Sequence, residues 1–168
     1  MAVVLFIATS TAGCGWHPRG SYQLPPDLRE LRTASLDSNS ALLLKLNRAL
    51  KSSKVEVTDA PTATRLLQLG HEEQKMRNVS LDQAARSAER EMRVTVEIRV
   101  LDKEGKPVWG PQPISASRIY SYDPNSVIAK EDEERLIYGE LQDNMIGQIM
   151  RRLQRIKETD SGLSTPAP

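Results

Sequence analysis

An unbroken alternation runs from residue 92 to residue 100, Met92-Arg93-Val94-Thr95-Val96-Glu97-Ile98-Arg99-Val100, with apolar residues at every even position and polar residues at every odd one. A period of two is typical of an antiparallel strand with one face on a core and the other in water. Burial of the apolar side chains contributes on the order of 10 kcal/mol before conformational entropy is subtracted. The pattern therefore predicts the central strand of the fold, with Val96 inside and Thr95 outside.

Weaker strand patterns flank this segment on both sides. A turn at 102–107, which contains Gly105, joins the central strand to the one that follows it. The region 76–86 is either a turn or an extension of the strand before it. The further strands are expected at 31–36, at 55–57, at 64–74 and between 108 and 122.

Two helices are predicted from apolar side chains that recur every three or four residues. The first follows Ser40, whose hydroxyl can cap it, and ends near Ser53. The second runs from about 127 to 157, with acids near its positive end and arginines near its negative end. Its apolar face is formed by Ile137, Leu141, Met145, Ile149, Leu153 and Ile156. The element order predicts an α+β fold, a two-layer sandwich of an about four-stranded mixed or antiparallel sheet with two helices packed on one face.

An uncharged apolar run opens the chain, and the only cysteine follows it directly. Residues 1–13 are typical of a signal peptide and are too short to cross a bilayer of about 30 Å as a helix. Thr11-Ala12-Gly13-Cys14 resembles a bacterial lipobox. A lone cysteine is more often a small buried hydrophobe, but its place behind an apolar leader favours acylation. We therefore predict export and membrane attachment through a lipid on Cys14.

The rest of the chain divides into three parts. We expect a lipidated tether at 14–30, the α+β domain at 31–157 and a disordered tail at 158–168. Gly15, rather than an aspartate, follows the cysteine, which resembles the sorting signal for the outer membrane. If Cys14 carries a lipid, no disulfide can form, and stability must rest on the hydrophobic core.

The composition and the absence of known motifs argue against nucleic-acid binding and enzyme activity. The net charge is +1, so the protein has no strong positive field that would attract nucleic acid. Aromatic residues make up 4% of the chain, which argues against a surface on which bases stack. The sequence contains no Gly-rich phosphate loop, Cys/His metal spacing or nucleophile elbow. His71-Glu72-Glu73 could begin a metal or acid/base site, although a solvated strand end is the simpler interpretation. We predict no enzyme activity, no cofactor and no nucleic-acid partner.

Lys130 is unexpected at the start of a helix. A cation there opposes the helix dipole, and Lys130 precedes Glu134 in the less favourable order for a pair four residues apart. Local structure alone therefore does not require a lysine at this position. Either Lys130 is a tolerated surface residue, or it binds a ligand.

Several short motifs together resemble one family. In order they are Cys14-Gly15-Trp16-His17 with Arg19, Ala88-Glu89, Asp123-Pro124-Asn125, Ala129-Lys130-Glu131-Asp132-Glu133 and Arg151-Arg152-Leu153. From Cys14 to Ile156 the chain is similar to LptE, the lipoprotein subunit of the outer-membrane lipopolysaccharide translocon. The family fold, a four-stranded sheet with two helices, agrees with the predicted element order.

The resemblance implies a non-enzymatic plug within the β-barrel of LptD, which assists the assembly of that barrel and contacts lipopolysaccharide. The implied location is the periplasmic side of the outer membrane and the barrel lumen. Lys130 falls on the family's lysine implicated in lipopolysaccharide binding. The family's second basic position falls on Gln83 in a gapless match, and Arg86 is the nearest basic substitute. A generic envelope lipoprotein that binds a periplasmic protein remains the alternative.

Overall fold

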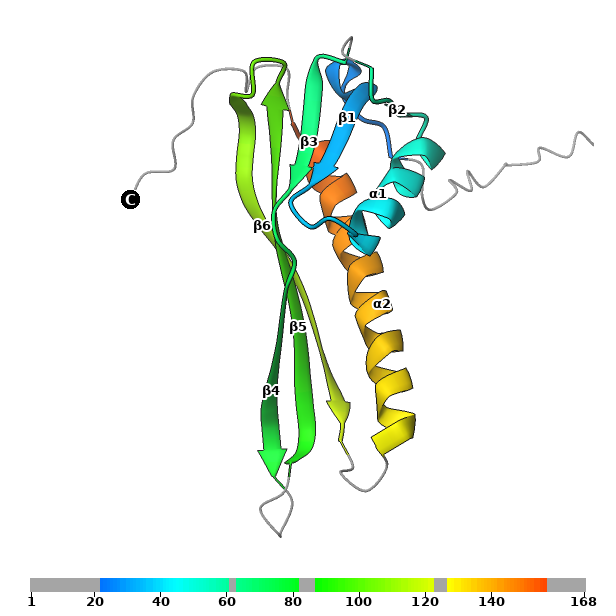
Figure 1. Cartoon of the computed structure of the whole chain (residues 1–168), viewed down its shortest axis with the longest axis vertical. Helices are drawn as coiled ribbons and strands as arrows, with labels where there is room; N and C mark the ends of the chain where they lie inside the picture. Colours follow the sequence, from blue (N-terminus) through cyan, green and yellow to red (C-terminus); the bar gives the residue numbers. More distant parts are fainter. Residues whose placement is uncertain (1–21, 61–62, 82–86, 123–126, 157–168) are drawn as a thin grey trace, which may run out of the picture.

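A computed structural model describes residues 22–60, 63–81, 87–122 and 127–156. The chain forms a mixed six-stranded sheet with two helices packed on one face (Figure 1). The elements are the short 3-10 helix η1 Pro26–Leu28, β1 Glu30–Ser35, α1 Ala41–Ser52, β2 Glu56–Val57, β3 Arg65–Leu69, β4 Glu73–Leu81, β5 Ser87–Asp102, β6 Pro107–Ser121 and α2 Val127–Leu153. The predicted α+β class is confirmed, whereas the predicted count of about four strands is wrong.

The extra strands arise at one edge of β5. The strand order is β2-β1-β3-β5-β4, and β6 pairs with β5 along its other edge. β3 pairs with residues 98–102 of β5 and β4 pairs with residues 87–95, both antiparallel. The strand predicted at 64–74 is therefore two strands, β3 and β4, and β4 continues beyond the predicted end to Leu81. β1 is parallel to both β2 and β3, which makes the sheet mixed.

A carboxylate occupies the interruption between β3 and β4. Asp37, which follows β1, accepts a hydrogen bond from the backbone N–H of Glu72 at 2.8 Å, and its other oxygen lies 2.7 Å from Nδ1 of His71. The carboxylate satisfies a backbone donor that a neighbouring strand would otherwise satisfy. His71 is thus exposed at a strand end, as the simpler interpretation of the sequence predicted. Glu72 departs from that interpretation, because it is partly buried and accepts a hydrogen bond from the Tyr138 hydroxyl.

The core lies between the sheet and the two helices. The even-numbered side chains from Met92 to Val100 are at most 1% exposed, which confirms the predicted alternation. All six apolar residues predicted for the buried face of the second helix are buried, although α2 ends at Leu153, before Ile156 and before the predicted end near 157. Leu42, Leu46 and Leu50 of α1 are buried as well. Ser40 caps α1 as predicted, accepting a hydrogen bond from Leu43 N at 3.0 Å.

The packed part of the chain begins before residue 31. Leu24 and Leu28, which lie in the segment predicted as a tether, are buried and belong to the same core cluster. Both side chains pack because the chain turns through η1 immediately before β1. Tyr22 also packs against this core, so the described part of the predicted tether belongs to the domain.

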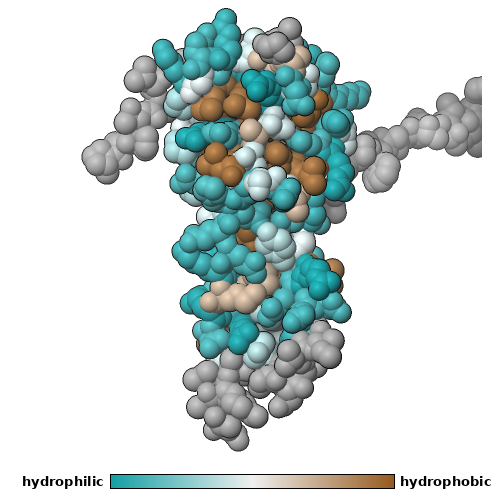
Figure 2. All heavy atoms as spheres, viewed as in Figure 1, coloured by the Kyte–Doolittle hydropathy of each residue, from teal (hydrophilic) through white to brown (hydrophobic). Residues whose placement is uncertain are grey.

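The domain is elongated, and its two ends differ. In Figure 1 the upper end holds β1, β2, β3 and α1, whereas the lower end consists of the β4, β5 and β6 ribbon with α2 alongside it. Hydrophobic residues gather over the upper half of this face, and the lower half is mostly hydrophilic (Figure 2). The 27 residues of α2 span about 40 Å at 1.5 Å per residue and connect both ends.

The outer face of the sheet carries a cluster of paired charges around Glu91. Arg77 on β4 donates to this carboxylate, and Nη2 of Arg93 lies 2.9 Å from it. The hydrogen bond from Arg77, that from Ser117 and that from Arg93 together lower the pKa of Glu91 to about 2. The carboxylate is therefore ionised over the whole range in which an unperturbed glutamate titrates.

We expect this cluster to make stability depend on pH in acid. A depressed pKa adds stability that is complete above the ordinary value of 4.5 and is lost as the pH falls toward 2. Glu91→Gln should therefore lower stability at pH 7 and flatten the acid limb of the stability curve. Denaturant melts of both proteins between pH 7 and pH 2 would measure this. Parallel curves for the two proteins would contradict it.

Candidate functional site

Lys130 lies at the lower end of the molecule and has three neighbours. Its Nζ donates to the backbone carbonyl of Ser121 and to Oε2 of Glu133, the latter at 2.6 Å. It also lies 5.9 Å from the centre of the Tyr120 ring. Only 15% of its side chain is exposed. These contacts give Lys130 structural partners that its position in the helix did not predict.

The contact with Ser121 belongs to a row along the edge of β6. Among the described strands, β6 pairs with β5 alone. Arg152 donates to the carbonyl of Pro113 and Gln148 to that of Ser115, both at 2.8 Å. With Lys130, these α2 side chains satisfy carbonyls that β6 does not share with another strand, and so limit unwanted strand pairing. An ammonium has three N–H donors, and Lys130 uses one on the Ser121 carbonyl and one on the Glu133 carboxylate.

A second cation lies close by on β5. The guanidinium of Arg90 stacks on Tyr122, and the Arg90 Cζ atom lies 3.3 Å from the centre of the tyrosine ring. It also interacts with Tyr120, next to which Lys130 lies. We call Arg90, Tyr120, Tyr122 and Lys130 the tip cluster. The tip cluster contains two cations and two aromatic rings. Arg90 lies on β5, Tyr120 on β6, Tyr122 directly after β6, and Lys130 on α2.

Burial fixes the ionisation of the central tyrosine in this cluster. The Tyr120 hydroxyl donates to Oε1 of Glu134 at 2.6 Å. Burial, followed by this hydrogen bond to a carboxylate, raises the pKa of Tyr120 to about 12. The phenol is thus a neutral donor at physiological pH, and the positive charge of the cluster comes from Arg90 and Lys130.

Only part of the predicted site can be placed. Lys130 is described, whereas Cys14, Gln83 and Arg86 lie outside the described residues. The structure instead places Arg90 next to Tyr120. The sequence alone did not identify Arg90 as a candidate site residue. A signal for it existed, because Arg90 has the even parity of Met92 and therefore points to the helix-covered face of β5.

Within the described residues, no group of His, Cys, Asp and Glu side chains is arranged to hold a metal ion. No described helix combines the length and the apolar character needed to cross a membrane.

Curated relatives share much of the chain. A protein of Pectobacterium atrosepticum called LPS-assembly lipoprotein LptE is 28% identical over 163 residues, covering 90% of this chain and 88% of the relative. A protein of the same name from Photorhabdus laumondii is 26% identical over 151 residues, covering 89% and 82% respectively.

Solved structures share the fold. A minor lipoprotein of Acinetobacter baumannii has a TM-score of 0.66 at 20% identity, covering 76% of this chain and 91% of its own. Rare lipoprotein B of Shewanella oneidensis has a TM-score of 0.60 at 25% identity, covering 74% and 89%. The model of the LptE family, described as lipopolysaccharide-assembly, matches residues 28–153, which include β5, β6, α2 and the tip cluster. The chain therefore belongs to the LptE family of lipopolysaccharide-assembly lipoproteins.

Proposed function

We propose that this lipopolysaccharide-assembly lipoprotein is anchored in the outer membrane through Cys14 and sits as a plug within the LptD β-barrel. There it supports barrel assembly and binds lipopolysaccharide during delivery to the cell surface. The tip cluster is the observation that carries the ligand-binding part. It places two cations around Tyr120 at one end of an elongated domain.

The chemistry of the tip cluster suits a phosphorylated glycolipid. A guanidinium such as that of Arg90 can hold a phosphate through two parallel hydrogen bonds. Lys130 retains one N–H donor beyond those given to Ser121 and Glu133. One charge pair at 4 Å contributes only about 1 kcal/mol in water, so binding requires both cations together. The ligand must also compete with Glu133 for Lys130.

Lys130→Asp should weaken lipopolysaccharide binding by about tenfold or more, because it places a negative charge where a phosphate would approach. It should also lower stability by about 1 to 2 kcal/mol, since the Ser121 carbonyl loses its donor. Added salt should weaken binding by the wild type, because exposed charge pairs are screened. Affinities for purified lipopolysaccharide at two salt concentrations, with thermal melts, measure these effects.

Glu133→Gln is the matched control for this substitution. It removes the carboxylate that pairs with Lys130 but keeps the lysine, so lipopolysaccharide affinity should be retained or increased. Equal weakening by Lys130→Asp and Glu133→Gln would show that the pair serves structure only. Arg90→Gln and Arg86→Asp, measured in the same way, decide which arginine supplies the second cation.

The partner is tested by purification from native outer membranes. A tagged chain, extracted in mild detergent, should retain one β-barrel protein, LptD, in equal amount, and Lys130→Asp should retain it as well. An unrelated outer-membrane lipoprotein carrying the same tag controls for membrane contamination. A soluble periplasmic protein as the stoichiometric partner would instead support the adaptor alternative.

A further inference from the structure

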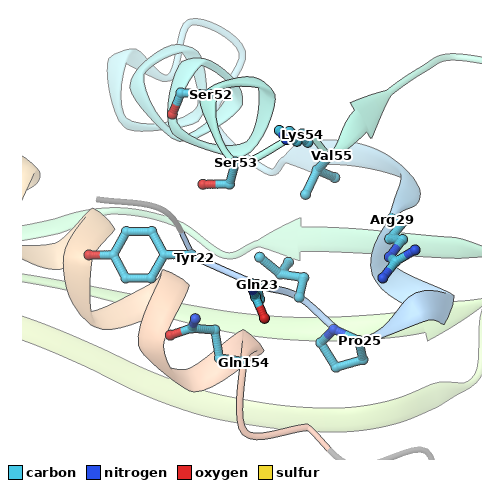
Figure 3. Close-up of a pocket in the computed structure, with 10 residues that line it drawn as sticks. Tyr22, Gln23, Pro25, Arg29, Ser52, Ser53, Lys54, Val55 and Gln154 are labelled. Atoms are coloured by element: carbon cyan, nitrogen blue, oxygen red, sulfur yellow. The ribbon is translucent and has the colours of Figure 1, made fainter. Parts of the chain in front are cut away.

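A cavity of about 720 Å³ lies where the described chain begins. Its walls are the segment from Tyr22 to Pro25, the last turn of α1 and Gln154 after α2 (Figure 3). Arg29 and Lys54 also line it, and none of the lining residues is acidic. This cavity is at the end of the domain opposite to the tip cluster (Figure 1).

The cations at this cavity lack acidic partners. The side chains of Arg29 and Lys54 make no hydrogen bond or ion pair with any described residue. Arg151 on α2 and Tyr22 both lie next to Gly147. The Arg151 Nη1 and the Tyr22 hydroxyl oxygen are 3.2 and 3.8 Å from the position that a Cβ would occupy on this glycine. Arg151 likewise has no such partner among the described residues. We call Arg29, Lys54 and Arg151 the Arg29 cluster.

Charge is segregated along the helical layer. Residues 130–143 of α2 contain six acids and two cations, whereas residues 144–156 contain three arginines and no acid. The segment 41–55, which includes α1, contains four lysines and arginines and no acid. The helices therefore present a basic surface at the end where the described chain begins, and an acidic one near the tip.

The backbone at Lys54 suggests that its charge matters. Lys54 follows the C-cap residue of α1 and has a φ of +62°, and hydrogen bonds run from Lys54 N to Lys51 O and from Val55 N to Leu50 O. Glycine is the usual residue at this position of a helix end, because the left-handed conformation is unfavourable for residues with a Cβ. A lysine here accepts that cost, and Lys54 lines the cavity.

We propose that the Arg29 cluster and its cavity bind the headgroup phosphates of anionic phospholipids at the surface of the membrane that holds the lipid anchor. The proposal rests on the proposed acylation of Cys14. From Cys14 to Tyr22 the chain can extend at most about 29 Å, which keeps this end of the domain near the bilayer surface. Each cation close to an anionic surface strengthens partitioning by about fivefold.

The test uses the mature chain from residue 14 with Cys14→Ser, which keeps every described residue and carries no acyl chain. Its sedimentation with phosphatidylcholine vesicles is compared with and without phosphatidylglycerol. The wild-type surface should bind only the vesicles with phosphatidylglycerol. Replacing the cluster by Arg29→Gln, Lys54→Asn and Arg151→Gln should weaken that binding on the order of 100-fold. Asparagine is chosen at position 54 because it tolerates a positive φ.

A second triple variant removes the same charge elsewhere. Lys75→Gln, Lys103→Gln and Arg135→Gln replace exposed cations that each lie beside an acid. This variant should bind within about threefold of the parent, since none of these three cations lines the cavity. Circular dichroism melts verify that both variants are folded. Equal losses in the two variants, or no loss when the Arg29 cluster is replaced, would overturn the proposal.

Two further measurements separate this site from other possibilities. Inorganic phosphate should release the protein at an ionic strength at which chloride does not, because the free anion competes with the headgroup phosphates for the cavity. Equal release by the two salts would overturn the assignment of the cavity to a phosphate group. Lipopolysaccharide affinity should be unchanged when the Arg29 cluster is replaced, because the tip cluster lies at the other end. A failure of the Lys130 prediction is therefore distinguishable from a failure of this one.

Discussion

Val96→Asp should lower the free energy of unfolding by about 3 to 5 kcal/mol, because it buries an unpaired carboxylate in the middle of the core. Val96 is 1% exposed and pairs with Ile114 of β6, which is fully buried. β5 pairs with β3 and β4 along one edge and with β6 along the other, so it is not an edge strand where water could reach the new carboxylate. Denaturant melts followed by circular dichroism would measure the loss.

Thr95→Asp is the matched control, one residue away on the opposite face of β5. That side chain is partly exposed and lies across from Glu73 on β4, so the new carboxylate costs only mild repulsion, below about 1 kcal/mol. Equal losses for Val96→Asp and Thr95→Asp would show that the assigned register of β5 is wrong.

Cys14→Ala should abolish lipid attachment completely and leave the precursor uncleaved, because the thiol is the atom group that accepts the acyl-bearing lipid. Acyl chains contribute about 0.8 kcal/mol per buried methylene, so their loss should release the protein from stable membrane anchoring. Mass spectrometry of the N-terminus, together with fractionation of membranes, measures both effects.

A neighbouring substitution provides the control for this prediction. Thr11→Leu places the commonest lipobox residue three positions before the cysteine and should be processed at least as efficiently as the wild type. An unmodified Cys14 in the mature wild-type protein would contradict the anchor itself. It would also remove the reason for expecting the Arg29 cluster near a membrane.

Local periodicity predicted much of the architecture. The alternation from Met92 to Val100 identified the central strand and its buried face, and three- and four-residue spacing identified the buried face of α2 from Ile137 to Leu153. The capping role of Ser40 was also readable. These features depend on residues within a few positions of one another, so the chain encodes them without reference to its partners.

The candidate site was only partly predictable. Lys130 was singled out from the sequence, but its contacts with Ser121 and Tyr120 were not. Arg90 was overlooked, although it stacks on Tyr122, 32 positions further along the chain. Such contacts require the pairing of β5 with β6 and the placement of α2 beside β6, which bring distant residues together.

The sequence by itself determined the fold class, the buried faces of β5 and α2, and the membership in a family. Only the tertiary structure decided that β3 and β4 are separate strands, because Asp37 from a distant loop caps the interruption between them. It alone also placed Arg90 beside Tyr120, and Arg29 with Lys54 at one cavity. The physical reason is the range of the interactions: periodic burial is a property of short segments, whereas a cluster of charges depends on the register and packing of segments far apart in the chain.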